Sequence, residues 1–161
     1  MTSAHVPLSM RSSRRRPGHG RRKSPLVEAA RRHKRIFAGD FEGRGQYQDD
    51  FERLATGRKP AVLAEVGFDE SVFPRYEDFL RELEAFEQEV YKLRYWVFKQ
   101  KDAGPSIFHI YVCKLRSVGL ALQAMDTTPL DQHAGAVGLL LGYPYENVVR
   151  YARRQAPCEF R

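Results

Sequence analysis

The sequence predicts an α+β domain in which a small antiparallel β-hairpin packs with helices, preceded by a disordered basic N-terminal arm. Three observations lead to this prediction. Apolar side chains recur at helical spacing over residues 74–90, which is typical of an amphipathic helix. Two aromatic-rich segments, 92–100 and 106–113, are separated by the turn signal Asp-Ala-Gly-Pro, which is typical of a hairpin. Residues 11–25 contain no apolar side chain.

Chain length and apolar content favour one globular domain. The 161 residues include ten Phe, eight Tyr and one Trp, enough for one modest core. A Gly-rich, turn-like stretch at residues 38–46 separates a basic leader from the rest. We therefore expect a disordered basic arm over 1–45, a single globular α+β domain over 46–156 and a short tail over 157–161.

Charge is distributed unevenly along the chain. Residues 1–35 carry nine Arg and two Lys against the single acid Glu28, a net charge of +10, whereas residues 36–161 carry 16 basic and 19 acidic residues, a net charge of −3. So polar a leader cannot bury enough apolar surface to offset the entropy of ordering it. We expect residues 1–25 to be disordered and 26–35 to form a transient rather than a stable helix. The cations expected to contact nucleic acid are Arg11, Arg14, Arg15, Arg16, Arg21, Arg22 and Lys23.

The predicted domain opens with a short helix over residues 47–57. Phe51 and Leu54 fall at helical spacing, acidic residues occupy the first turn, and Gly57 can end the helix. Lys59 precedes a proline and is therefore biased away from helical dihedral angles. The next segment is accordingly an extended link or a short helix.

The clearest predicted helix begins at Pro74. Beyond Val90 the pattern is ambiguous, because Leu93 and Val97 would continue the helical stripe although the segment is rich in aromatic residues. We favour a strand over 92–100 that forms an antiparallel hairpin with a second strand over 106–113. The apolar stripe of the helix consists of Tyr76, Phe79, Leu80, Leu83, Phe86 and Val90.

Three further helices are predicted after the hairpin. The first covers 114–125, where Gly119 is a weak point. Thr128 can cap the second helix, Gly142 can end it in a left-handed conformation, and Pro144 can begin the third. The break at Leu-Gly-Tyr-Pro is therefore a tight corner between two packed helices. In the last helix, Tyr145, Val148, Val149 and Ala152 are expected to face inward, and Arg150, Arg153 and Arg154 outward.

Four segments of the chain resemble, in the same order, segments of a known family. They are LATGRKPAVLAEV, the amphipathic helix with its hairpin, FHIYVCKLRSVGLAL, and HAGAVGLLLGYPYENVVRYA. Over residues 51–154 they resemble the bacterial family known as domain of unknown function 3793, and Leu-Gly-Tyr-Pro followed by an acid and a Val is the most specific part. The resemblance implies an α+β fold with a hairpin after the long helix, and it implies no activity, cofactor or catalytic residue.

The chain also departs from that family. Family members have an insertion before the final helix pair and a Cys-rich, aromatic extension after it, whereas this chain ends at QAPCEFR. The basic arm has no counterpart in the family. A function that resides in the extension would therefore be absent here.

The chemistry-bearing residues give a candidate pocket without a recognisable reaction. His133 could ligate a metal or act as a base, but no second His or carboxylate stands at helical ligand spacing from it. His109 and Cys113 would share one face of the predicted strand, where a thiol–imidazole pair is conceivable but core packing is favoured. No GxSxG, phosphate-loop, GxGxxG or HExxH motif is present. The candidate pocket residues are Lys59, His109, Cys113, His133 and Tyr143, and we expect no metal or cofactor.

These observations favour a non-enzymatic binding or interaction module whose arm contacts nucleic acid without sequence preference, through counterion release. Two alternatives stay open: a metal-binding or thiol- and His-dependent enzyme, and a structural partner subunit of a protein complex. The Arg- and Ser-rich arm also fits an organellar presequence, although the resemblance to a bacterial family argues against one. A helix-turn-helix reading of the final helix pair is disfavoured, because its arginines lie at the C-terminal end, away from where recognition helices read bases.

The sequence also predicts where the protein resides. No apolar stretch approaches the length of about 18 residues that a membrane span needs, and the N-terminus lacks the apolar region of a secretory signal. The two cysteines, Cys113 and Cys158, fit a reducing compartment. We expect a soluble, cytoplasmic protein without a membrane partner.

Overall fold

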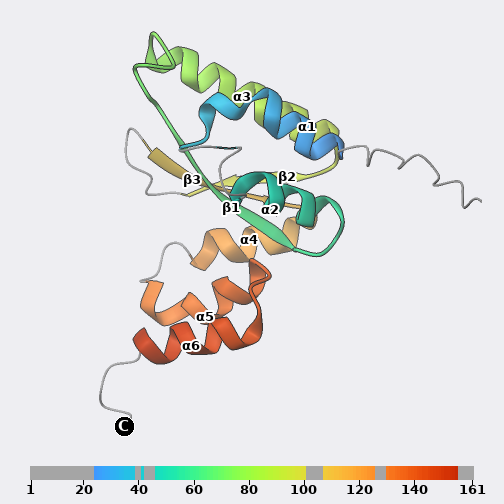
Figure 1. Cartoon of the computed structure of the whole chain (residues 1–161), viewed down its shortest axis with the longest axis vertical. Coiled ribbons are helices and arrows are strands. Elements are labelled where there is room, and N and C mark those ends of the chain that lie inside the picture. Colours follow the sequence, from blue (N-terminus) through green and yellow to red (C-terminus); the bar gives the residue numbers. More distant parts are fainter. Residues whose placement is uncertain (1–23, 39–40, 42–45, 101–106, 126–129, 156–161) are drawn as a thin grey trace, which may run out of the picture.

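The computed structural model describes residues 24–38, 41, 46–100, 107–125 and 130–155 (Figure 1). This part of the chain combines helices with a three-stranded antiparallel sheet, which confirms the predicted α+β fold class. In chain order the elements are α1 (Pro25–Arg32), the 3-10 helix η1 (Lys34–Ile36), α2 (Gln46–Ala55), β1 (Ala61–Gly67), α3 (Tyr76–Lys92), β2 (Trp96–Lys99), β3 (Ile107–Cys113), α4 (Arg116–Met125), α5 (Leu130–Leu140) and α6 (Tyr145–Gln155).

The sheet has the order β1-β3-β2, so the last strand along the chain lies in the middle. β3 pairs antiparallel with both neighbours, and Cys113 stands opposite Ala61 on one side and Trp96 on the other. The predicted hairpin of β2 and β3 is therefore present, and β1 is a strand where the sequence allowed an extended link or a short helix. Its alternate residues Val62 and Val66 are fully buried, and β3 supplies the backbone partners that make the extended form stable.

The sheet separates two apolar cores. Along β3, Phe108, Ile110 and Val112 face the larger core, whereas Tyr111 and Cys113 face the smaller one, as the two-residue period of a strand requires. Side chains of α1, α2 and α3 fill the larger core, and those of α4 and of the segment around the end of α5 fill the smaller one. Figure 1 shows α1 and α3 on one side of the sheet and α4, α5 and α6 on the other.

The prediction that residues 26–35 form only a transient helix within the arm is wrong. They belong to α1 and η1, whose side chains Leu26, Val27 and Ile36 are buried in the larger core. Ser24 caps α1, because its Oγ accepts a hydrogen bond from the N–H of Val27 at 3.2 Å. Helices this short are marginal in isolation, so burial against α2 and α3 stabilises α1. Residues 25–36 therefore belong to the folded part of the chain and not to a disordered arm.

The predicted strand over 92–100 is too long. The helical stripe continues to the end of α3 at Lys92, and β2 covers only Trp96–Lys99. Arg94 makes the turn between them with a φ of 66°, the left-handed conformation that usually requires glycine. The N–H of Tyr95 donates to the carbonyl oxygen of Val90 at 3.2 Å and closes the helix end.

Gly119 brings α4 close to the sheet. A Cβ at this position would lie 2.1 Å from ring carbons of Phe98 and 2.8 Å from the Sγ of Cys113. The glycine that looked like a weak point in the helix is thus required for the packing of α4 on β2 and β3.

The corner between α5 and α6 has the predicted form. Gly142 has a φ of 75°, and the N–H of Tyr143 donates to the carbonyl oxygen of Gly138 at 3.0 Å, which completes the cap that ends α5. The inward orientation predicted for Tyr145 is wrong, because this residue stands at the corner with 70% of its surface exposed. Val148, one turn later, is the first buried residue of α6.

Candidate functional site

Two of the predicted pocket residues, Lys59 and Tyr143, do lie together. Lys59 is only 6% exposed, and its Nζ lies 2.9 Å from Oδ1 of Asp50 and 5.1 Å from the ring centroid of Tyr143. Burial raises the pKa of the Tyr143 hydroxyl, and the nearby charge of Asp50 adds to this. Tyr143 lies between α5 and α6, Asp50 in α2 and Lys59 in the loop before β1. The cluster therefore connects the last helix pair to the rest of the fold.

His109 and Cys113 do not form a pair. They share one face of β3, as predicted, but Tyr111 stands between them and four residues of strand span about 13 Å. Cys113 is fully buried, and burial raises its thiol pKa to about 11, so the thiol is protonated at neutral pH. The Nε2 of His109 instead lies 3.3 Å from Oε1 of Glu65 on the neighbouring strand. The arrangement lacks the geometry of a thiolate–imidazole nucleophile.

The remaining predicted residues lie outside what the structure describes. His133 belongs to α5, but the surroundings of its side chain are not described. The arm cations over residues 11–23 likewise lie outside the described ranges. Their assignment to nucleic acid stays a prediction from the sequence.

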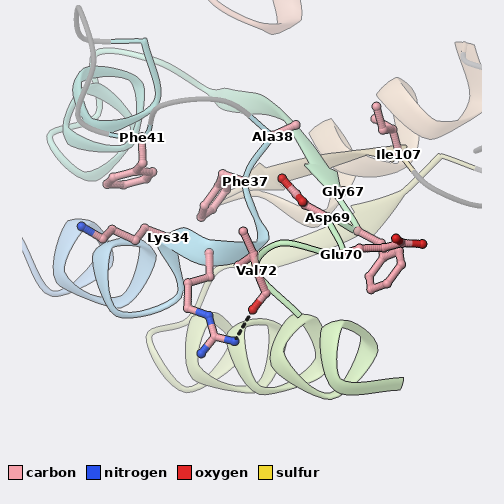
Figure 2. A pocket seen from close by; sticks show the side chains of 11 residues that line it. Lys34, Phe37, Ala38, Phe41, Gly67, Asp69, Glu70, Val72 and Ile107 are labelled. Atoms are coloured by element: carbon pink, nitrogen blue, oxygen red, sulfur yellow. Dashed lines mark hydrogen bonds between the residues drawn. The ribbon is translucent and has the colours of Figure 1, made fainter. Parts of the chain in front are cut away.

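A cavity of about 860 Å³ lies between η1 and the end of β1 (Figure 2). The ammonium group of Lys34 points away from it. Arg35 donates to the carbonyl oxygen of Val72 at 3.3 Å and stacks on the ring of Phe73 at 4.6 Å. Asp69 accepts hydrogen bonds from the N–H and hydroxyl of Ser71, which lowers the pKa of its carboxyl group. Arg35 and Asp69 thus already have partners within the fold, and the lining combines these residues and Glu70 with apolar side chains such as Phe37 and Phe41.

A second, smaller cavity of about 210 Å³ lies between α5 and α6. Asn147 supplies the polar side chain of its lining, and the other lining residues are Val137, Gly138, Leu141, Tyr143, Val148 and Tyr151. Two of these, Tyr143 and Tyr151, are about half exposed, at 49% and 51%. The arginines of α6, Arg150, Arg153 and Arg154, are exposed on the same helix, as predicted.

Tyr151 is a candidate that the sequence analysis missed. It stands four residues after Asn147 and three before Arg154, so these three side chains neighbour one another on the helix surface. The signal that could have identified it is a tyrosine flanked by Arg150 and Arg153 in the helix that follows the Leu-Gly-Tyr-Pro corner. Among the aromatic residues of this helix, an inward-facing role was predicted for Tyr145 and no role was predicted for Tyr151.

A polar cluster between α1 and α3 was also missed. Nδ1 of His33 lies 3.0 Å from Oε1 of Glu82, and its Nε2 lies 2.9 Å from Oε2 of Glu89. Arg32 donates to the other oxygen of Glu89. The hydrogen bond from Arg32, followed by that from His33, holds the pKa of Glu89 below its usual range. The cluster joins two helices, and no group of three metal-ligating side chains occurs among the described residues.

Comparison with known proteins adds no relative. No family model matches the chain, and neither a curated protein nor a solved structure matches it. The resemblance to domain of unknown function 3793 therefore stays a prediction from the sequence. Within the described residues, no helix is long and apolar enough to span a membrane.

Proposed function

We propose that this protein is a non-enzymatic binding module that contacts nucleic acid through the cationic segment at residues 11–23. The observation that carries the proposal is the uneven distribution of charge along the chain. Residues 1–23 carry seven cations and no acid, which equals the entire net charge of +7, so the chain from residue 24 onward is neutral overall. Ser24, the residue directly after the last of these cations, caps α1.

This placement favours a polyanion as the partner of the segment. The body offers no net negative charge with which seven cations could pair. Contacts between arginine and phosphate release condensed counterions, and this supplies affinity that does not depend on the base sequence. The proposal needs no catalytic residue, and it is consistent with a buried, protonated thiol at Cys113.

The test is the binding of labelled duplex DNA to the full chain at about 50 and 200 mM salt. If six or seven phosphates are contacted, we expect the affinity to fall by about a thousandfold between these two conditions. A variant with Arg11, Arg14, Arg15, Arg16, Arg21, Arg22 and Lys23 replaced by Gln should lose most of the binding and most of the salt dependence.

The matched truncation should start at Ser24. A truncation at residue 45 would delete α1 and expose the apolar surface that Leu26 and Val27 cover, so loss of binding could then reflect misfolding. Undiminished duplex binding by the Ser24 truncation, with an unchanged circular dichroism spectrum, would overturn the proposal.

A further inference from the structure

The corner of α5 and α6 presents an aromatic, cationic surface around a small apolar cavity. Tyr143 and Tyr151 are about half exposed beside the cavity of about 210 Å³. The exposed side chains on the rest of α6 include Arg150, Arg153 and Arg154. Tyrosine and arginine are also the residue types that most often dominate binding surfaces.

The cavity is sized for one ring and not for a whole small molecule. Pockets for drug-sized ligands enclose about 300–1,000 Å³. A small number of polar groups in the lining of such a pocket fix the orientation of the ligand. Here the volume is about 210 Å³, and Asn147 alone among the described lining residues adds a polar side chain other than tyrosine. An inserted planar ring would contact Val137, Leu141 and Val148 at the base and the rings of the two tyrosines at the mouth.

Two arginine side chains of α6 lie next to the cavity, where they could contact the part of a ligand that remains outside it. Arg150 lies three residues after Asn147, and Arg154 lies three residues after Tyr151, so both adjoin residues that line the cavity. No acidic group among the described residues pairs with either arginine. Glu146, four residues before Arg150, is the acid on this helix, and it stands at the first turn, away from Arg154.

We infer that this corner binds single-stranded nucleic acid, with one base held in the cavity against Tyr151 and the adjoining phosphates on Arg150 and Arg154. The inference rests on the proposed function and adds the strandedness of the partner and a second contact site. Bases can stack on aromatic side chains only when they are free of the duplex, and arginines beside such rings follow the backbone. A polyanion also complements both cationic parts of the chain, whereas an apolar protein segment would leave the arginines without partners.

The experiment compares an oligo(dT) of about 20 nucleotides with a duplex of the same length, because single-strand sites cover about 4–16 nucleotides. We expect Tyr151→Ala to weaken binding of the single strand by about five- to a hundredfold and to leave duplex binding unchanged. Tyr151→Phe, which keeps the ring, should bind as the wild-type protein does. Tyr145→Ala is the matched control, because Tyr145 is exposed but does not line the cavity.

A second pair of variants tests the arginines. Arg154→Ala should weaken single-strand binding and reduce its salt dependence, and Arg53→Ala, an exposed arginine on α2, should not. Equal single-strand affinity of Tyr151→Ala and wild-type protein would overturn the inference. So would an equal loss for single strand and duplex, or self-association of the protein that Tyr151→Ala abolishes.

The outcomes separate this inference from the proposed function. If replacing the cations of residues 11–23 has no effect while Tyr151→Ala weakens single-strand binding, the proposed arm contact fails and the corner site stands. If the arm variant loses duplex binding while Tyr151→Ala leaves single-strand binding unchanged, the proposed arm contact stands and the corner site fails. Circular dichroism of each variant checks that the fold is retained.

Discussion

The two sides of the sheet are built differently. In the larger core, rings of Phe37, Phe51 and Phe86 contact one another edge to face, and Phe51 and Phe86 are fully buried. Polar groups above that core pair between helices, as in the contacts of His33 with Glu89. The α5–α6 corner instead leaves large apolar and aromatic side chains in solvent, and its arginines are unpaired among the described residues. Burial and pairing stabilise the first side, and the second keeps side chains available for binding.

The largest expected effect of a single substitution lies in the aromatic core. Phe51→Ala should lower the free energy of unfolding by about 3–5 kcal/mol, because the ring is fully buried among Phe37, Phe41 and Phe86. Leu139→Ala at the corner should cost less than about 1 kcal/mol, since 49% of that side chain is exposed. Urea denaturation measures both values. Similar costs for the two variants would remove the contrast between the two sides.

The second-largest loss of stability is expected at Lys59, which connects the two sides of the sheet. Lys59→Met breaks the buried pair with Asp50 and the contact with Tyr143, and we expect a loss of about 1–3 kcal/mol. Hydrogen exchange should rise more in α5 and α6 than in α1 and α3, because Lys59 links the corner to α2. The control is Lys99→Met, whose pair with Glu87 is half exposed at the lysine end and should be worth less than about 1 kcal/mol.

Acid should weaken the polar contact between α1 and α3. The pKa of Glu89 is lower in the folded state than in the unfolded state, so its contribution is present above an unfolded pKa of about 4.3 and is lost as the pH falls through the folded value. We expect Glu89→Gln to cost about 1 kcal/mol at pH 7, a value discounted because Arg32 is 57% exposed, and to flatten the decline of stability below about pH 4. Denaturation at several pH values measures this. Glu84→Gln, an exposed position on the same helix, should leave the decline unchanged.

The smallest effect is expected at the turn between α3 and β2. Arg94→Gly removes the steric strain of a left-handed residue but increases the entropy of the unfolded chain, so the net gain should be about 0–1 kcal/mol. Thermal denaturation would show the midpoint unchanged or slightly raised. A clear loss of stability would mean that the Arg94 side chain contributes contacts that outweigh its backbone strain.

Local sequence patterns determined most of the elements. The stripe from Tyr76 to Val90 predicted α3, the turn signal between two aromatic segments predicted the hairpin, and Gly142 with Pro144 predicted the corner of the last two helices. Each of these signals depends on neighbours within a few residues, and backbone and side-chain preferences act over that range. The cationic character of residues 1–23 is likewise a property of the sequence alone.

Contacts between distant residues decided the rest. α1 is too short and too basic to be stable by itself, and it forms because Leu26 and Val27 are buried against helices that follow it in the chain. β1 becomes a strand because β3, whose paired residues stand 40 to 52 positions later in the chain, supplies its hydrogen-bond partners. Tertiary packing also set Lys59 against Asp50 and Tyr143. The residues near each of these positions in the sequence do not predict these outcomes. The free energy of each contact depends on groups that only the folded chain brings together.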